Sequence, residues 1–380
     1  MRIHFVLAGL HRVRRGAEVA FESIAQNIAL AGQDEVTVFG SGHTLAGRAY
    51  GFQHVPLIVR ERFERWPSVP FLRNDCMYEE LTFAAGLLAT RRAGAADVTV
   101  TCGYPYTNWA LRSWGTGPAS AAHVFVTQNG DWPAISDKRE YRFFACDGLV
   151  CTNPQYWQRN RERWNTTLIP NGIDPSKFHP GPANRAALGL PENARIVLFA
   201  SALVANKRVV EGLRAVAQIP DAFCVVAGDG PLRQEVDQLA AQLLPGRFLR
   251  KTFPHHQMAD LYRSADVFFH PCIGESFGNV YVEALSCGVP VVAHDEAITR
   301  WIFEDHAVLV NTDDEAATVA ALRRALLTPP AARAAGAGFA RARYDWSTIA
   351  AQYRAFLAGV VERRRSGVAE ARKIAATQVE

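Results

Sequence analysis

Short apolar runs alternate with helical patterns along most of the chain, and this alternation constrains the fold more than any other feature. The runs are rich in Val, Ile and Phe and lack an apolar–polar alternation, which is typical of strands buried on both faces of a parallel sheet. Between the runs, segment 17–32 carries Phe21, Ile24 and Ile28 at helical spacing. The predicted strands are 3–9, 35–40, 97–102, 123–128, 148–153, 195–202, 223–228, 266–271, 289–293 and 307–311. The pattern predicts an α/β protein with doubly wound parallel sheets.

A segment dense in proline and glycine, IPNGIDPSKFHPGPANR (169–185), interrupts the alternation, which then starts again. A chain of 380 residues also suits two domains of ordinary size better than one core. We therefore predict two Rossmann-like domains, 1–168 and 169–344, that face each other across a cleft. The last part, 345–380, begins with a long amphipathic helix that is too polar to form a third core.

Composition and charge exclude several classes of protein. The net charge of +4 and the pI near 8.7 argue against a dedicated nucleic-acid binder. No apolar run reaches the roughly 18 residues needed to span a bilayer, and the apolar core of the N-terminus is too short for a signal peptide. The seven cysteines are odd in number and contain no C-x-x-C pair, which indicates reduced thiols in a cytoplasmic compartment and no zinc site.

Glycine-rich turns follow several predicted strands. Gly16 follows the first strand, Gly228 lies in AGDGPLR (227–233), and Gly278 lies in ESFGN (275–279). Such a turn before a helix presents backbone N–H groups and a positive dipole end to a phosphate. Neither G-x-G-x-x-G nor the P-loop pattern is complete, so NAD-type and P-loop binding are not expected.

The segment GESFGNVYVEAL (274–285) places Glu275 in the loop before a helix and Glu283 inside that helix, with Ser276 as the expected N-cap. Glu283 interrupts an apolar stretch, where a carboxylate needs a partner. The backbone N–H groups at the helix start would hold a diphosphate with one carboxylate on each side, and carboxylates bind vicinal hydroxyls well. This arrangement suits a nucleoside diphosphate sugar. The alternative is that both glutamates are solvated.

The chain resembles the GT-B glycosyltransferases, in particular the large retaining family 4, along nearly its whole length. The matching segments are Gly16-Ala17-Glu18, IPNGID (169–174), AGDGPLR (227–233), ESFGNVYVEALSCGVPVVA (275–293) and DWSTIAAQY (345–353). The resemblance implies retaining sugar transfer from a UDP- or GDP-linked donor, without a metal or a cofactor. It also implies that Glu275 contacts the donor sugar and Glu283 the ribose, and that the segment Phe277, Gly278, Asn279 and Val280 holds the diphosphate.

One departure from the family concerns the positive charge at the diphosphate. In SALVANKR (201–208), Lys207 occupies the family's lysine position, but Ala202 stands where an arginine is expected. A replacement cation is therefore expected nearby. Arg15 or Arg14 of the first loop is favoured and Arg208 comes second; the alternative is that these arginines stay in solvent.

A second departure lies in VTQNGDWP (126–133), where many relatives carry a histidine that touches the donor sugar. Here Gln128 or Asn129 takes its place, and an amide can still bind a hydroxyl. Asp131 is a candidate to assist the acceptor, although an ordinary turn residue fits the pattern equally well. His270 is expected to be a core histidine.

The resulting hypothesis is a glycosyltransferase whose acceptor is a small molecule, a lipid-linked glycan or a polysaccharide. The alternatives are a GT-B epimerase or phosphorylase and a non-catalytic subunit that binds a nucleotide sugar. The basic and aromatic segment VRERFERW (59–66) would allow peripheral contact with anionic lipid at the inner membrane face, but a solvated helix face is favoured. The sequence leaves the base, the sugar, the acceptor and the oligomeric state open.

Overall fold

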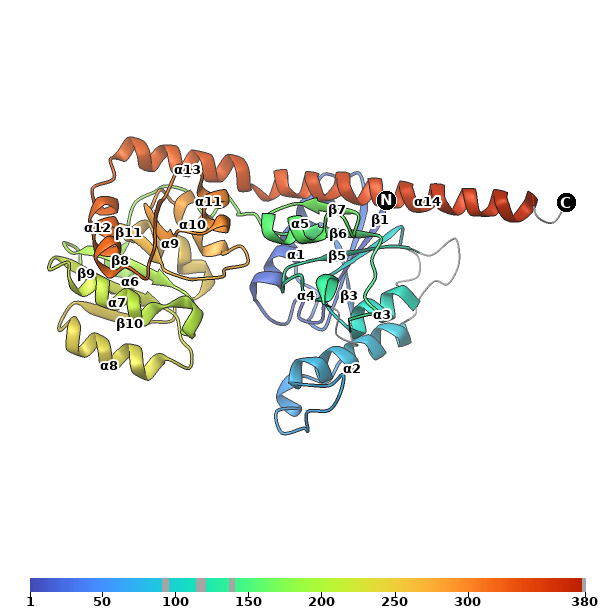
Figure 1. The fold of residues 1–380 in the computed structure, drawn as a ribbon, viewed down its shortest axis with the longest axis horizontal. Coiled ribbons are helices and arrows are strands. Elements are labelled where there is room, and N and C mark those ends of the chain that lie inside the picture. Colours follow the sequence, from blue (N-terminus) through green and yellow to red (C-terminus); the bar gives the residue numbers. More distant parts are fainter. Residues whose placement is uncertain (91–95, 114–120, 137–140, 378–380) are drawn as a thin grey trace. The chain divides into compact units, whose positions relative to one another are not determined.

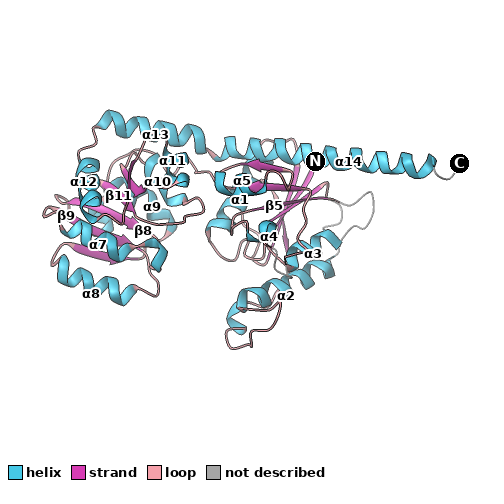
Figure 2. Cartoon of the chain, viewed as in Figure 1, coloured by secondary structure: helices cyan, strands magenta, loops and turns pink. Residues whose placement is uncertain are grey.

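The computed structural model describes residues 1–90, 96–113, 121–136 and 141–377, with the side chains of all but 113 and 368–377. The chain divides into two compact units. Unit 1 comprises Met1–Asn171 and Trp346–Glu380, and unit 2 comprises Gly172–Asp345. Each unit is a sheet covered by helices (Figure 2).

Within the described residues, unit 1 holds a seven-stranded parallel sheet with the order β3-β2-β1-β4-β5-β6-β7. The strands are β1 (Arg2–Val6), β2 (Glu35–Gly40), β3 (Gly51–His54), β4 (Val98–Thr101), β5 (Ala122–Val126), β6 (Gly148–Cys151) and β7 (Thr166–Leu168). In β1, Ile3 pairs with Val36 on one side and Val98 on the other, so the order of strands reverses between β1 and β4.

Helices cover both faces of this sheet. On one face, Ile3 and Phe5 pack with α1 (Gly16–Leu30) and the last helix, α14 (Trp346–Thr377), which is red in Figure 1. On the other face, Val6 packs with α2 (Asp75–Thr90) and α3 (Tyr106–Ser113). The shorter helices are α4 (Trp132–Ile135) and α5 (Pro154–Asn160), with a 3₁₀ turn η1 (Arg60–Arg62) before α2. The C-terminal helix thus completes the core of unit 1.

Unit 2 holds, in the part that the structure describes, a six-stranded parallel sheet with the order β10-β9-β8-β11-β12-β13. The strands are β8 (Arg195–Ala200), β9 (Ala222–Ala227), β10 (Phe248–Lys251), β11 (Val267–His270), β12 (Val291–His294) and β13 (Val308–Val310). The helices are α6 (Arg185–Leu188), α7 (Val209–Ala217), α8 (Arg233–Leu243), α9 (Met258–Ser264), α10 (Asn279–Ser286), α11 (Ala297–Phe303), α12 (Glu315–Leu326) and α13 (Pro330–Tyr344). Alternate residues face opposite cores: Leu198 packs toward α9, α10, α11 and α13, and Phe199 packs toward α7, α8 and α12.

The two sheets confirm the prediction of a doubly wound α/β fold. Every predicted strand coincides with a strand of the structure, but the sequence missed β3, β7 and β10. All three lie at an edge of their sheet, and none of their residues is fully buried. An edge strand can carry polar residues such as those of GFQH or FLRK, and it therefore lacks the apolar run on which the prediction depends.

Candidate functional site

Two loops at the carboxyl ends of β8 and β11 form the centre of the candidate site in unit 2. The order of strands reverses between these neighbours, and doubly wound sheets bind ligands at such a point. The first loop ends in the 3₁₀ turn η3 (Ala205–Lys207), and the second, 271–278, leads to α10. The backbone N–H of Ile273 donates to the carbonyl oxygen of Asn206 at 3.1 Å. This bond holds the two loops together.

The carboxylate of Glu275 is bound from three sides. Its Oε2 lies 2.5 Å from Lys207 Nζ and 3.3 Å from His270 Nε2, and its Oε1 accepts from the backbone N–H of Ser276 at 3.2 Å. Burial by itself would raise the pKa of Glu275, but the hydrogen bond from His270 and the charge of Lys207 outweigh it and lower the pKa to about 2. Glu275 is therefore an anion throughout the physiological pH range.

Lys207 and His270 reach Glu275 from different elements. Burial lowers the pKa of Lys207, but the negative charge of Glu275 outweighs this effect and raises it above the ordinary value, so the side chain is a cation. His270, at the end of β11, is 1% exposed, and its ring packs edge-on against Tyr281. It is thus a core residue, as the sequence indicates, but it also contacts Glu275. No pattern in the sequence predicted this contact between His270 and Glu275.

Helix α10 begins two residues later than an N-cap at Ser276 would place it, so that prediction is wrong. The helix begins at Asn279, after Gly278 with a φ of +75°. A Cβ at Gly278 would lie 2.5 Å from Cδ2 of Tyr281, so only glycine fits this turn. The half-buried residues 278–280 carry backbone N–H groups of the first turn, which a helix itself cannot satisfy.

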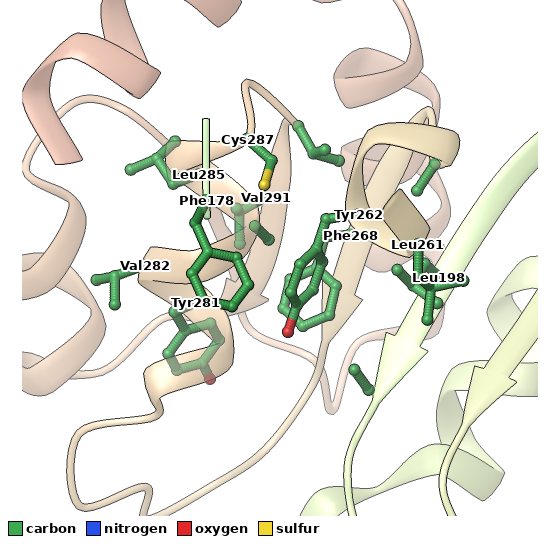
Figure 3. Packing of buried hydrophobic residues seen from close by; sticks show 14 of the residues in the cluster. Phe178, Leu198, Leu261, Tyr262, Phe268, Tyr281, Val282, Leu285, Cys287 and Val291 are labelled. Atoms are coloured by element: carbon green, nitrogen blue, oxygen red, sulfur yellow. The ribbon is translucent and has the colours of Figure 1, made fainter. Parts of the chain in front are cut away.

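Glu283 lies on α10 with its carboxylate next to a buried phenol. The hydroxyl of Tyr262, on α9, donates to Glu283 Oε2 at 2.9 Å. The ring of Tyr262 packs edge-on against Phe268 in the core of unit 2 (Figure 3). Burial raises the pKa of Glu283 to about 7, and the hydrogen bond from Tyr262 offsets this only in part. Glu283 was expected to need a partner because it interrupts an apolar stretch, and that partner is Tyr262. With this pKa the carboxyl of Glu283 changes its charge near neutral pH.

Phe277 and Gly228, two further predicted donor-site residues, have structural roles. The side chain of Phe277 is buried, with its ring 5.7 Å from that of Tyr344, so only its backbone is available to a ligand. A Cβ at Gly228 would lie 1.9 Å from the carbonyl oxygen of Ser201. Glycine is required there because the segments after β8 and β9 approach each other closely.

Two neighbouring cations in the loop after β8 contact different partners. Lys207 contacts Glu275, whereas Arg208 pairs with Asp313 at 2.7 Å and donates to the hydroxyl of Thr312 at 3.0 Å. Ala202, at the position of the expected arginine, is exposed. Arg208 is thus held at the carboxyl end of β13.

In unit 1, the loops after β1 and β4 lie beside a cluster of ionic side chains. Glu79, on α2, is buried and pairs with two guanidinium groups, those of Arg12 and Arg60. Glu18, on α1, is also buried, and its Oε2 has no hydrogen-bond partner among the residues that the structure describes. Burial raises the pKa of Glu18, and its own backbone N–H and the charges of Arg15, Arg60 and Arg12 offset this only in part. An unpartnered buried oxygen here is available to a ligand.

Asn129 and Glu80 lie near the same cluster. Asn129 is exposed, with its Nδ2 3.8 Å from Sγ of Cys102, which follows β4. Glu80, on α2, accepts from the backbone N–H of Thr107 at 3.2 Å, and burial raises its pKa to about 7. Burial and then the charges of Glu18 and Glu80 raise the pKa of Cys102. The sequence missed the glutamates of α2 because they belong to no segment with a recognised pattern.

Asp131 is held by structural partners. It is 4% exposed, pairs with the guanidinium of Arg159 through both carboxylate oxygens at 2.8 and 3.1 Å, and accepts from Asn160 at 3.0 Å. This geometry fixes the loop, and the expectation that Asp131 assists an acceptor stays a prediction. Gln128 exchanges two amide hydrogen bonds with Asn171, at 2.6 and 3.1 Å.

The remaining sequence expectations concern the surface of unit 1. The predicted residues where α1 begins are all exposed: Arg14, Arg15 and Gly16. Segment 59–66 contains the 3₁₀ turn η1 and no α-helix. Phe63 is buried, whereas Arg62 and Arg65 are exposed, so these charges are solvated but do not lie on a helix face. None of the described helices is both long and apolar enough to cross a membrane.

Comparisons with known proteins agree with the fold. The family described as glycosyl transferases group 1 matches residues 181–340. Sucrose-phosphate synthase from Thermosynechococcus elongatus has a TM-score of 0.73 at 21% identity, covering 94% of this chain and 99% of that one. Anabaena HepE in complex with UDP and glucose has a TM-score of 0.71 at 18% identity, covering 94% and 100%. These similarities establish the GT-B fold.

Sequence relatives show the family. A D-inositol 3-phosphate glycosyltransferase from Stackebrandtia nassauensis is 33% identical over 220 residues, which is 52% of this chain and about half, 49%, of the relative. One of the same name from Mycolicibacterium gilvum is 33% identical over 325 residues, 77% of this chain and 69% of the relative. The motifs of both units, the GT-B architecture and this coverage lead to one conclusion: the chain belongs to the glycosyl transferases group 1 family.

Proposed function

We propose that the protein transfers a sugar from a UDP- or GDP-linked donor to a polyhydroxylated acceptor, with retention of the anomeric configuration and without a metal. The observation that carries this proposal is the pair Lys207–Glu275 beside the first turn of α10. It joins a cation, an anion and backbone N–H groups at the switch point of a doubly wound sheet. Such a combination suits a diphosphate and the hydroxyls of a sugar.

In this proposal Lys207 exchanges partners when the donor binds. Its ammonium carries three donors, one of which now faces Glu275 at 2.5 Å. Phosphate oxygens near the start of α10 offer further acceptors. Lys207 and the helix N-terminus then stabilise the charge that grows on the leaving diphosphate, which is electrostatic catalysis by groups already in place. Glu275, freed in part from Lys207, accepts hydrogen bonds from the sugar.

Glu283 is proposed to bind the ribose. One of its oxygens is fixed by Tyr262, and the half-buried carboxyl keeps capacity for further donors. Two vicinal hydroxyls are good partners for an ionised carboxylate. Because donors to the carboxylate favour its charged form, nucleotide binding should lower the pKa of Glu283 from its value of about 7.

The acceptor is proposed to bind at the cluster of Glu18, Glu80 and Asn129 in unit 1. The unpartnered Oε2 of Glu18 and the amide of Asn129 suit hydroxyl groups. The relatives are named for D-inositol 3-phosphate, and a cyclic polyol fits this chemistry. Arg12 and Arg60 both pair with the single carboxylate of Glu79, so one net positive charge remains beside this cluster.

The experiment is a thermal-shift screen with UDP- and GDP-hexoses, followed by nucleotide release with and without polyols. We expect one donor to raise the melting temperature and the acceptor to accelerate release. Stabilisation without any release would identify a binding subunit instead, and release of the nucleotide with epimerised free sugar would identify an epimerase. Absence of stabilisation by any nucleotide sugar at millimolar concentration would contradict the proposal.

A further inference from the structure

His270, Cys272 and Glu275 form a compact group of metal-ligating side chains at the end of β11. Their nitrogen, sulfur and oxygen atoms all lie within 4.8 Å of one another. Imidazole, thiolate and carboxylate together are a ligand set typical of zinc. The sequence spacing H-x-C-x-x-E is not a standard zinc motif, which explains why the sequence predicts no zinc site.

The distances between these atoms are close to those of tetrahedral coordination. Two nitrogen or oxygen ligands at about 2.0–2.1 Å from zinc lie roughly 3.3–3.4 Å apart, and a sulfur at about 2.3 Å lies roughly 3.5–3.6 Å from them. His270 Nε2 and Glu275 Oε2 are already 3.3 Å apart. The ligand atoms lie within 4.8 Å of one another, so the distance from the sulfur of Cys272 to the other two has to shorten by no more than roughly 1.3 Å to complete three corners of a tetrahedron.

A cation already occupies this place. The ammonium of Lys207 lies 2.5 Å from Glu275 Oε2, and its side chain also interacts with that of Cys272. The group thus provides a position for positive charge, and a divalent ion would compete with Lys207 for it. The side chains of Lys207 and Glu275 are 19% and 12% exposed, which gives an ion access from their side.

We propose that His270, Cys272 and Glu275 form an inhibitory site for zinc or another divalent cation that prefers thiolate. Binding forms bonds from the metal to Nε2 of His270, the sulfur of Cys272 and a carboxylate oxygen of Glu275. The thiol proton passes to solvent, the imidazole changes tautomer so that its proton moves from Nε2 to Nδ1, and water fills the fourth position. The bound ion takes Glu275 from Lys207, and the like charges of the ion and the ammonium drive Lys207 away. Neither Glu275 nor Lys207 is then available to bind the nucleotide sugar. The binding step stands by itself, and only the inhibition rests on the proposed function.

Cobalt(II) added to the reduced protein is the probe of the binding step. We expect thiolate-to-cobalt charge-transfer absorption and the visible bands of tetrahedral cobalt, both displaced by zinc. Cys272→Ser should abolish the charge-transfer band, whereas Cys76→Ser, which alters the exposed cysteine, and Cys224→Ser should retain it. Lys207→Met removes the competing ammonium and should tighten cobalt binding, with circular dichroism as the check of folding. A wild-type protein without the band, or a band lost only with Cys76, overturns the proposal.

Inhibition is measured separately for each variant, as its rate of nucleotide release with zinc divided by the rate of the same variant without zinc. We expect the zinc concentration for half-inhibition to rise at least about tenfold in Cys272→Ser and to stay unchanged in Cys76→Ser. EDTA should restore the wild type. Equal inhibition of the wild type and Cys272→Ser contradicts the inhibitory role. If the chain has no transferase activity, the cobalt spectra still decide the site.

Discussion

Binding of a nucleotide sugar should weaken as the pH falls from 8 to 6, because Glu283 must be ionised to bind the ribose. With a pKa of about 7, this carboxyl is about 90% ionised at pH 8 and about 10% at pH 6. The dissociation constant should therefore rise about tenfold over this range if only the ionised form binds well. The donor contributes nothing to this change, since a diphosphate esterified at both ends has no proton to lose near neutral pH.

Glu283→Gln removes the titrating group but keeps an oxygen that accepts from Tyr262. At pH 8 the variant should bind the donor about tenfold or more weakly, since a charge-assisted hydrogen bond contributes about 1.5–3 kcal/mol. Its affinity should no longer depend on pH between 6 and 8. Burial lowers the pKa of the neighbouring His270 below its ordinary value, which favours the neutral form of that ring.

The assay is isothermal titration calorimetry with the hexose donor that stabilises the protein best, at pH 6, 7 and 8. Glu235→Gln is the matched control, since this exposed glutamate lies on α8 and contacts none of the site residues described above. The control should reproduce the pH dependence of the wild type. The reasoning is refuted if Glu283→Gln binds as tightly as the wild type, or if its affinity retains the full pH dependence.

Three further predictions concern other groups. Glu80→Gln should raise the melting temperature at pH 8 but not at pH 4. With a pKa of about 7 in the folded protein, ionisation of Glu80 costs the folded state up to roughly 3 kcal/mol above that pH, and it costs nothing where the carboxyl is protonated in both the folded and the unfolded chain. An unchanged melting temperature at pH 8 would argue against this prediction. Asp131→Asn should lower the melting temperature through the loss of its pairing with Arg159, with a smaller effect on turnover; a fully stable but inactive variant would instead support a role of Asp131 at the acceptor. If Arg14 or Arg15 adds positive charge at the diphosphate, each alanine variant should lose about ten- to a hundredfold in turnover and Ala202→Arg should rescue it, whereas full activity in both variants refutes that proposal.

Much of the fold follows from the sequence because the central strands are buried on both faces. Runs such as RIVLFA in β8 have no alternative to a covered sheet, so their pattern is unambiguous. The edge strands β3, β7 and β10 each pair with the strand that precedes them in the chain, and their local composition, which lacks an apolar run, does not reveal this pairing. The long helix α14 was predicted from its apolar face, and the structure shows that face packed on α1.

The candidate site was predictable only in part. The sequence placed Glu275 and Lys207 in loops that follow strands and Glu283 inside a helix, but it could not show which side chains would meet. Tyr262, which precedes Glu283 by 21 residues and lies on another helix, donates to its carboxylate, and the ring of the buried His270 contacts Glu275. Such contacts depend on side-chain direction and on the packing of separate elements. The Ser276 cap failed for a related reason: the positive φ of Gly278 moved the start of α10.

The measurement that tests the central claim most directly is acceptor-dependent sugar transfer by the wild type and by Lys207→Met. Mass spectrometry of the acceptor and the release of nucleoside diphosphate report the reaction, with Glu235→Gln as the control and circular dichroism as the check of folding. Lys207 is the cation found at Glu275, so its removal should slow transfer about ten- to a hundredfold or more while donor binding weakens less. A folded Lys207→Met variant that transfers sugar at the wild-type rate would contradict the account.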